Sequence, residues 1–167
     1  MKKLYLLKAI IDFFWIMALI SFPLILLFIG YLLISDEPFD IPIKMNGVEI
    51  TVLDLTTKIV LFFVTISYFV LLYSIFLFKK LLSLFQKRII FDYDVIKYLN
   101  QIGISFVVSA FLVGIPSLVY KIHTRKIGIE IGDSPFLYLV SLGLFFMVLS
   151  EVFKIAKTMK EENELTV

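Results

Sequence analysis

The sequence contains no cysteine and a single histidine, and these absences exclude several kinds of site. Without cysteine, neither a disulfide nor a thiolate metal site can form. His123 has no cluster of carboxylates beside it in the sequence, so we expect no metal site and no cofactor. The chain also lacks a glycine-rich phosphate loop and a paired nucleophile and base. We therefore predict that the protein is not an enzyme and has no catalytic residue.

Charged side chains are absent from the centres of the long apolar runs. Proton pumps, ion-coupled transporters and voltage sensors need ionisable groups at that depth in the membrane. A small transporter or channel is therefore the least favoured membrane function, because four helices would line a path only as an oligomer.

Apolar residues make up 60% of the 167 residues, and the mean hydropathy is +1.00. A helix of about 20 apolar residues crosses the ~30 Å hydrocarbon layer of a bilayer. Four such runs occur, at residues 9–34, 59–78, 104–120 and 135–153. We predict one all-α membrane domain over residues 1–167, with four transmembrane helices. We expect the first run to be retained rather than cleaved as a signal peptide.

Lysine and arginine are distributed unevenly between the ends of these runs. Eleven of the sixteen lie in the N-terminal segment, the connection 79–103 and the tail 154–167. The predicted outer loops, residues 35–58 and 121–134, hold the other five. Positive charge favours the cytoplasmic side, so we predict that both termini lie in the cytoplasm.

The first outer loop has the pattern of a β-hairpin. Apolar residues alternate on both sides of Asn46-Gly47, a pair typical of a two-residue type I′ turn, and this register places Lys44 opposite Glu49. An isolated hairpin is only marginally stable. We therefore expect a small extracytoplasmic sheet of about three strands, with residues 127–131 as the third, covering the outer end of the bundle.

The connection 79–103 is predicted to contain two amphipathic elements. Leu81 and Leu82 alternate with cations, which indicates a short basic segment at the lipid surface. Asp92 is the predicted N-cap of a new helix, and Asp94 adds negative charge to its first turn. Direct binding of nucleic acid is not expected, because membrane topology alone accounts for the cations. An apolar stripe carries the new helix into the third span: Val95, Leu99, Ile102 and Phe106.

Two further patterns concern the spans themselves. Lys8 and Asp12 are four residues apart, so we predict an ion pair at the inner interface rather than an intramembrane proton carrier. The third span carries small residues on one face, which predicts close approach of another helix. These candidate packing residues are Gly103, Ala110, Gly114 and Ser117.

Two sequence elements carry a family resemblance. They are Ile90-Phe91-Asp92 with Val95-Ile96, Leu99 and Ile102-Gly103, and the ending Glu162-Asn163-Glu164-Leu165-Thr166-Val167. Together with the order of the four spans, they resemble a bacterial membrane family, the domain of unknown function family 2975. The resemblance covers nearly the whole chain and implies a multi-pass protein of the bacterial cytoplasmic membrane. Genes of this family often neighbour one for a small helix-turn-helix DNA-binding protein, so the resemblance implies such a regulator as a partner.

We therefore predict a membrane-anchored regulatory or adaptor protein that binds this regulator on its cytoplasmic face. The alternative is a structural, envelope-stress or immunity-type membrane protein that acts through its outer loops. The lipid bilayer and further copies of the chain are the other expected partners. The candidate docking residues are Phe91, Asp92, Asp94, Lys97, Glu162, Asn163, Leu165 and Val167.

Overall fold

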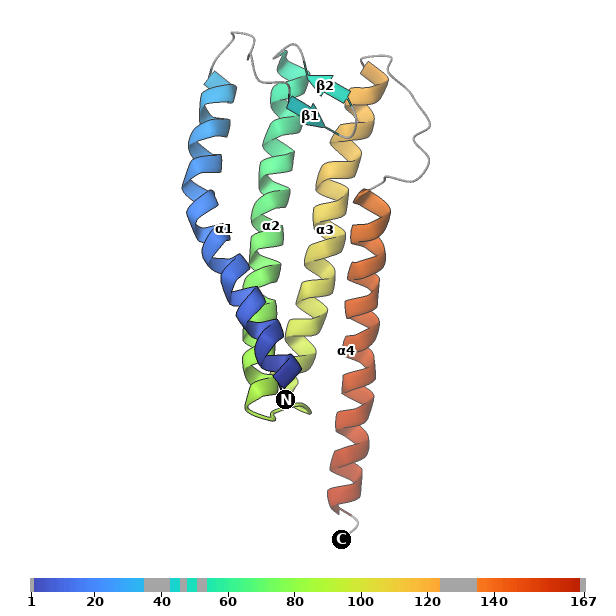
Figure 1. Cartoon of the computed structure of the whole chain (residues 1–167). Coiled ribbons are helices and arrows are strands. Elements are labelled where there is room, and N and C mark those ends of the chain that lie inside the picture. Colours follow the sequence, from blue (N-terminus) through green and yellow to red (C-terminus); the bar gives the residue numbers. More distant parts are fainter. Residues whose placement is uncertain (1, 35–42, 46–47, 51–53, 124–134, 166–167) are drawn as a thin grey trace.

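The protein is built from four long helices in an up-and-down arrangement (Figure 1). The computed structural model describes residues 2–34, 43–45, 48–50, 54–123 and 135–165. Both ends of the chain lie at one end of the bundle, here named the terminal end; the opposite end is named the hairpin end. The helices are α1 (Lys2–Ile34), α2 (Leu55–Gln86), α3 (Tyr93–His123) and α4 (Pro135–Leu165).

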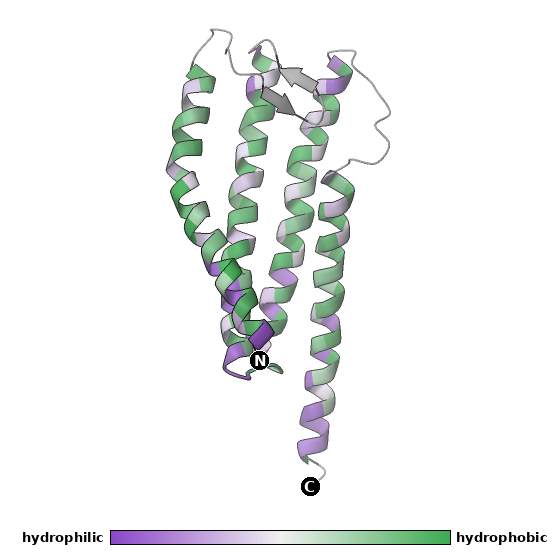
Figure 2. Cartoon of the chain, in the orientation of Figure 1, coloured by the Kyte–Doolittle hydropathy of each residue, from purple (hydrophilic) through white to green (hydrophobic). Residues whose placement is uncertain are grey.

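Each of the four predicted apolar runs lies inside one of these helices. Every helix is long and apolar enough to cross a membrane. Figure 2 shows apolar residues along most of each helix and hydrophilic residues gathered near the terminal end, above all in the last turns of α4. The prediction of a four-span integral membrane protein is therefore confirmed, because such surfaces are stable only in lipid.

The predicted outer sheet is the part of the fold class that needs correction. The strands β1 (Ile43–Met45) and β2 (Val48–Ile50) are three residues long and pair antiparallel, with Lys44 opposite Glu49. In the described part of the chain they form a two-stranded sheet that has no extensive contact with any helix. The expectation of a larger sheet that covers the bundle is therefore wrong, because strands this short offer too little surface to form a layer. The Asn46-Gly47 turn and the expected third strand lie outside the described residues.

The buried core lies between α2 and α3 near the terminal end. Leu77 and Leu81 of α2 pack there against Val95, Leu99 and Ile102 of α3. α2 continues as a helix through residues 79–86, where Leu81 and Leu82 are buried and Leu81 packs against α3. The prediction of a lipid-surface segment is therefore wrong. The segment leaves the lipid surface because Leu77 and Leu81 of α2 pack on the apolar stripe of α3, and that stripe was predicted correctly.

A tight turn joins α2 to α3. Arg88 adopts a left-handed conformation with φ of 61°. Its N–H donates to the carbonyl of Phe85 at 3.1 Å, and the N–H of Ile89 donates to the carbonyl of Leu84 at 3.0 Å. These two bonds form a Schellman motif, which satisfies the last carbonyls of α2 and ends the helix.

Small residues allow α3 and α4 to approach closely. A Cβ atom on Gly103 would lie 2.6 Å from the carbonyl oxygen of Gly143 on α4. A Cβ atom on Gly114 would lie 2.7 Å from Cδ2 of Phe136, also on α4. Of the other two predicted packing residues, Ala110 and Ser117 are buried. The structure thus places both glycines of the predicted stripe against α4.

α1 packs mainly on α2 and is held there by polar contacts. Asp12 Oδ1 lies 3.3 Å from Lys79 Nζ, and Lys8 Nζ donates to Gln86 Oε1 at 3.0 Å. The predicted pair of Lys8 with Asp12 is therefore wrong, because α2 extends far enough to offer both side chains a partner. Pro23 lies inside α1, which is visibly bent (Figure 1). A proline removes one backbone hydrogen bond, which accounts for such a bend.

Candidate docking face at the terminal end

The terminal end brings the last turns of α4 against the turn between α2 and α3. Phe153 of α4 stacks on Phe85, with 6.1 Å between ring centroids, and lies 6.4 Å from the ring of Phe91. Ser150 Oγ donates to the carbonyl of Ile96 at 2.9 Å. One face of α4 is thereby fixed to the rest of the bundle, and Phe91 is part of that attachment.

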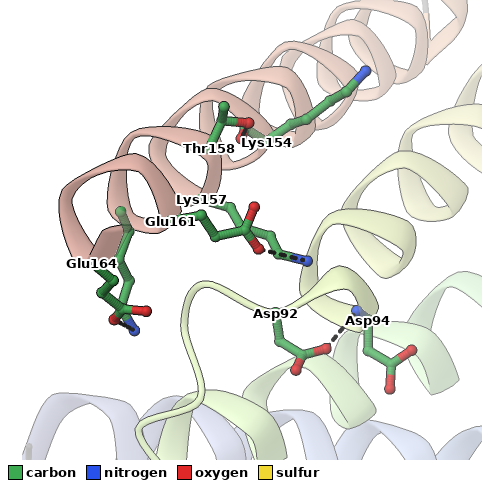
Figure 3. A network of polar contacts seen from close by, with 8 residues as sticks. Asp92, Asp94, Lys154, Lys157, Thr158, Glu161 and Glu164 are labelled. Atoms are coloured by element: carbon green, nitrogen blue, oxygen red, sulfur yellow. Dashed lines mark hydrogen bonds and ion pairs between the residues drawn. The ribbon is translucent and has the colours of Figure 1, made fainter. Parts of the chain in front are cut away.

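Asp92 and Asp94 lie at the start of α3. The N–H of Asp94 donates to Asp92 Oδ1 at 2.8 Å, and the N–H of Ile96 donates to the carbonyl of Asp92 at 3.3 Å. These are the contacts of an N-cap residue, as predicted for Asp92. Both carboxylates lie beside the turn that joins α2 to α3, and Figure 3 shows them opposite the last turns of α4.

Ion pairs line the side of α4 that faces the turn between α2 and α3. Lys157 pairs with Glu161 and Lys160 with Glu164, each at 3.6 Å. Lys157 Nζ also lies 6.0 Å from the ring of Tyr93. Such exposed pairs contribute little to stability, because salt and water screen them. They do keep the last turns of α4 helical in water through i,i+4 contacts.

The opposite side of the same turns is apolar and uncovered. Val152, Ile155 and Met159 follow one another at i, i+3 and i+7, which places them on one side of the helix. They are 53%, 60% and 62% exposed. This set is named the outer stripe of α4. Within the membrane such exposure is normal, but the stripe lies among Glu151, Lys154, Lys157 and Lys160 and continues beyond the predicted end of the span at residue 153.

The structure brings some of the predicted docking residues together. Phe91 contacts α4, Asp92 and Asp94 lie beside it at the start of α3, and Lys97 is exposed one turn further along α3. Glu162, Asn163 and Leu165 are exposed in the last turn of α4. Val167 lies outside the described residues.

The docking residues predicted from the sequence do not include the outer stripe. The available signal was an apolar residue at every third or fourth position between lysines beyond residue 153. Among the described residues, no group of three histidine, aspartate or glutamate side chains could hold a metal ion.

Comparison with known proteins places the chain in one family. No curated protein and no solved structure matches it significantly. The model of a family described as "Protein of unknown function (DUF2975)" matches residues 9–167, from the first membrane helix to the end of the tail. The chain is therefore a member of the DUF2975 family, a four-span integral membrane protein.

Proposed function

We propose that the protein is a membrane-anchored adaptor that holds a small helix-turn-helix regulator at the cytoplasmic face of a bacterial inner membrane. The terminal end is that face in this proposal, because the excess of lysine and arginine favours the cytoplasmic side. The role requires binding and no catalysis.

The outer stripe of α4 is the observation that carries the proposal. Val152, Ile155 and Met159 expose apolar surface on a helix whose neighbouring side chains are charged. Ile155 and Met159 lie beyond the predicted end of the span, and apolar surface that remains in water there is unfavourable by roughly 25 cal/mol per Å². A second helix that lies along the stripe removes this surface from water, and amphipathic helices recognise anchors with this spacing.

The position of the stripe also supports a protein partner. α4 projects beyond the other three helices at the terminal end (Figure 1). Its inner side is already occupied by Phe85 and Phe91, so the outer stripe is the side from which a partner can approach. Genes of the family often lie next to a gene for a small helix-turn-helix protein, as the family resemblance implies, and this supports such a regulator as the partner.

Co-purification from native membranes tests the proposal. The full chain is expected to retain the regulator, and Met159→Glu is expected to lose it because a charge would be buried in the contact. Removal of residues 160–167 is expected to weaken retention as well.

Lys154→Glu is the matched control, since it adds a negative charge to the same helix on a side outside the stripe. It is expected to retain the regulator. Retention that is equal in wild type, Met159→Glu and the truncated chain would refute docking on α4.

A further inference from the structure

An apolar groove lies between α1 and α2, in the part of the bundle towards the terminal end. Its volume is about 330 Å³, and aromatic and aliphatic side chains line it. Trp15 packs on Phe76 at one end, with 5.4 Å between ring centroids, and Phe22 packs on Phe69 at the other, at 5.2 Å. Leu19 on the rim is 55% exposed. The groove therefore opens to the outside of the bundle, where the bilayer lies.

Polar contacts hold the two helices together near each end of the groove. Asp12 pairs with Lys79 on the terminal side, and Ser21 shares a hydrogen bond with the hydroxyl of Tyr68 near Phe22. On α1 the groove runs from Trp15 to Phe22, seven residues apart, which corresponds to ~10 Å along a helix. The groove is thus preformed and covers about two thirds of the thickness of one leaflet, since the whole hydrocarbon layer is ~30 Å thick.

Positive charge gathers where the groove meets the membrane surface. Lys79 lies one turn beyond Phe76, and Lys80 Nζ lies 4.4 Å from the centroid of the Phe76 ring. Asp12 offsets one of these two cations, so the local charge remains positive.

We propose that this groove binds an anionic phospholipid of the leaflet at the terminal end. One acyl chain lies between Trp15 and Phe22, and the headgroup phosphate meets Lys79 and Lys80. A zwitterionic lipid offers the same hydrocarbon but no net charge to the cations. Basic pockets between membrane helices on the cytoplasmic side bind anionic headgroups in this way.

Trp15 is the only tryptophan of the chain, so its fluorescence reports on the groove alone. The protein is reconstituted into vesicles of phosphatidylcholine and phosphatidylglycerol at one fixed ratio. In one sample only the phosphatidylglycerol chains carry bromine, which quenches nearby tryptophan, and in the other only the phosphatidylcholine chains do. We expect that, per mole of brominated lipid, phosphatidylglycerol quenches the fluorescence of Trp15 more strongly than phosphatidylcholine does.

Lys80→Gln is expected to lower this preference about fivefold, which is the effect of one surface cation on an anionic lipid. Lys79→Gln also removes a cation, but it removes the partner of Asp12 at the same time. Lys79→Arg is therefore measured beside it, because arginine keeps the charge, and this variant is expected to keep the preference for phosphatidylglycerol. Lys154→Gln, which removes a cation remote from the groove, is the control and is expected to have no effect.

Two results would overturn the proposal. Equal quenching by both lipids in the wild-type protein would show that the groove takes any acyl chain. An unchanged preference for phosphatidylglycerol in Lys80→Gln would show that the lipid is attracted by the overall charge of the protein and not by a specific site. Circular dichroism of each variant establishes that the helices are intact.

Discussion

Gly103 and Gly143 face each other where α3 meets α4, and each excludes a side chain on the other. A Cβ atom on either glycine would lie 2.6 or 2.7 Å from the backbone oxygen of its partner. We predict that Gly103→Ala lowers the free energy of unfolding by about 1–3 kcal/mol, because the two helices must move apart. Thermal unfolding in detergent, followed by circular dichroism, measures the effect.

Gly30 provides the matched control within the same chain. A Cβ atom there would have no neighbour within 4 Å, and the residue lies inside α1. Gly30→Ala is expected to raise stability by up to ~1 kcal/mol, since alanine is the better helix former. Changes of equal sign in the two variants would contradict the close contact between α3 and α4.

Asp54 caps the start of α2 and gives a dependence of stability on pH. Its Oδ1 accepts bonds from the Thr57 hydroxyl at 2.6 Å and the Thr57 N–H at 2.8 Å. These bonds, with a smaller effect of His123, hold the pKa of Asp54 below its ordinary value of 3.8. The contribution of the carboxylate is therefore present above that value and is lost as the pH falls through the lowered pKa. Asp54→Ala is expected to cost about 1 kcal/mol at neutral pH.

Asp54→Asn tests the sign of this effect. Asparagine retains an acceptor for the cap but has no titrating group, so the variant should lose less stability than wild type on acidification to below pH 3.8. Parallel pH profiles for the two proteins would show that the cap does not depend on the charge of Asp54.

Arg88 is the described residue other than glycine with a positive φ. A side chain in this conformation is unfavourable by roughly 1–2 kcal/mol, and glycine avoids most of this penalty. We predict that Arg88→Gly stabilises the protein by about 1 kcal/mol in thermal unfolding. Lys87→Gly, at the adjacent residue with φ of −77°, is expected to destabilise it. The opposite order of the two variants would argue against the Schellman turn.

The number of membrane helices could be predicted from the sequence, and each predicted apolar run lies inside one of the four helices. A run of apolar residues as long as 9–34 has few other stable structures, because lipid requires every backbone group to be bonded internally. The stripe of Val95, Leu99 and Ile102 also lies in the core as expected. These features depend on local patterns, which a single sequence contains.

The contacts between helices could not be predicted in the same way. Asp12 has Lys8 within one turn, yet its partner is Lys79, which is distant in sequence. The role of Gly143 became visible only when α4 was placed against Gly103. Likewise, Leu81 looks suited to a lipid surface until α3 covers it. Each of these outcomes depends on which helix lies beside which, and several arrangements satisfy the same periodicity.

Site-specific photo-crosslinking from α4 in native membranes tests the proposed adaptor role most directly. A photoreactive amino acid replaces Met159 in the outer stripe or, as a control, Phe145, which is exposed on α4 inside the predicted membrane span. We predict that position 159 yields an adduct with a small helix-turn-helix protein, identified by mass spectrometry, and that position 145 does not. Adducts at position 159 with only lipid or a second copy of the chain would contradict the adaptor role.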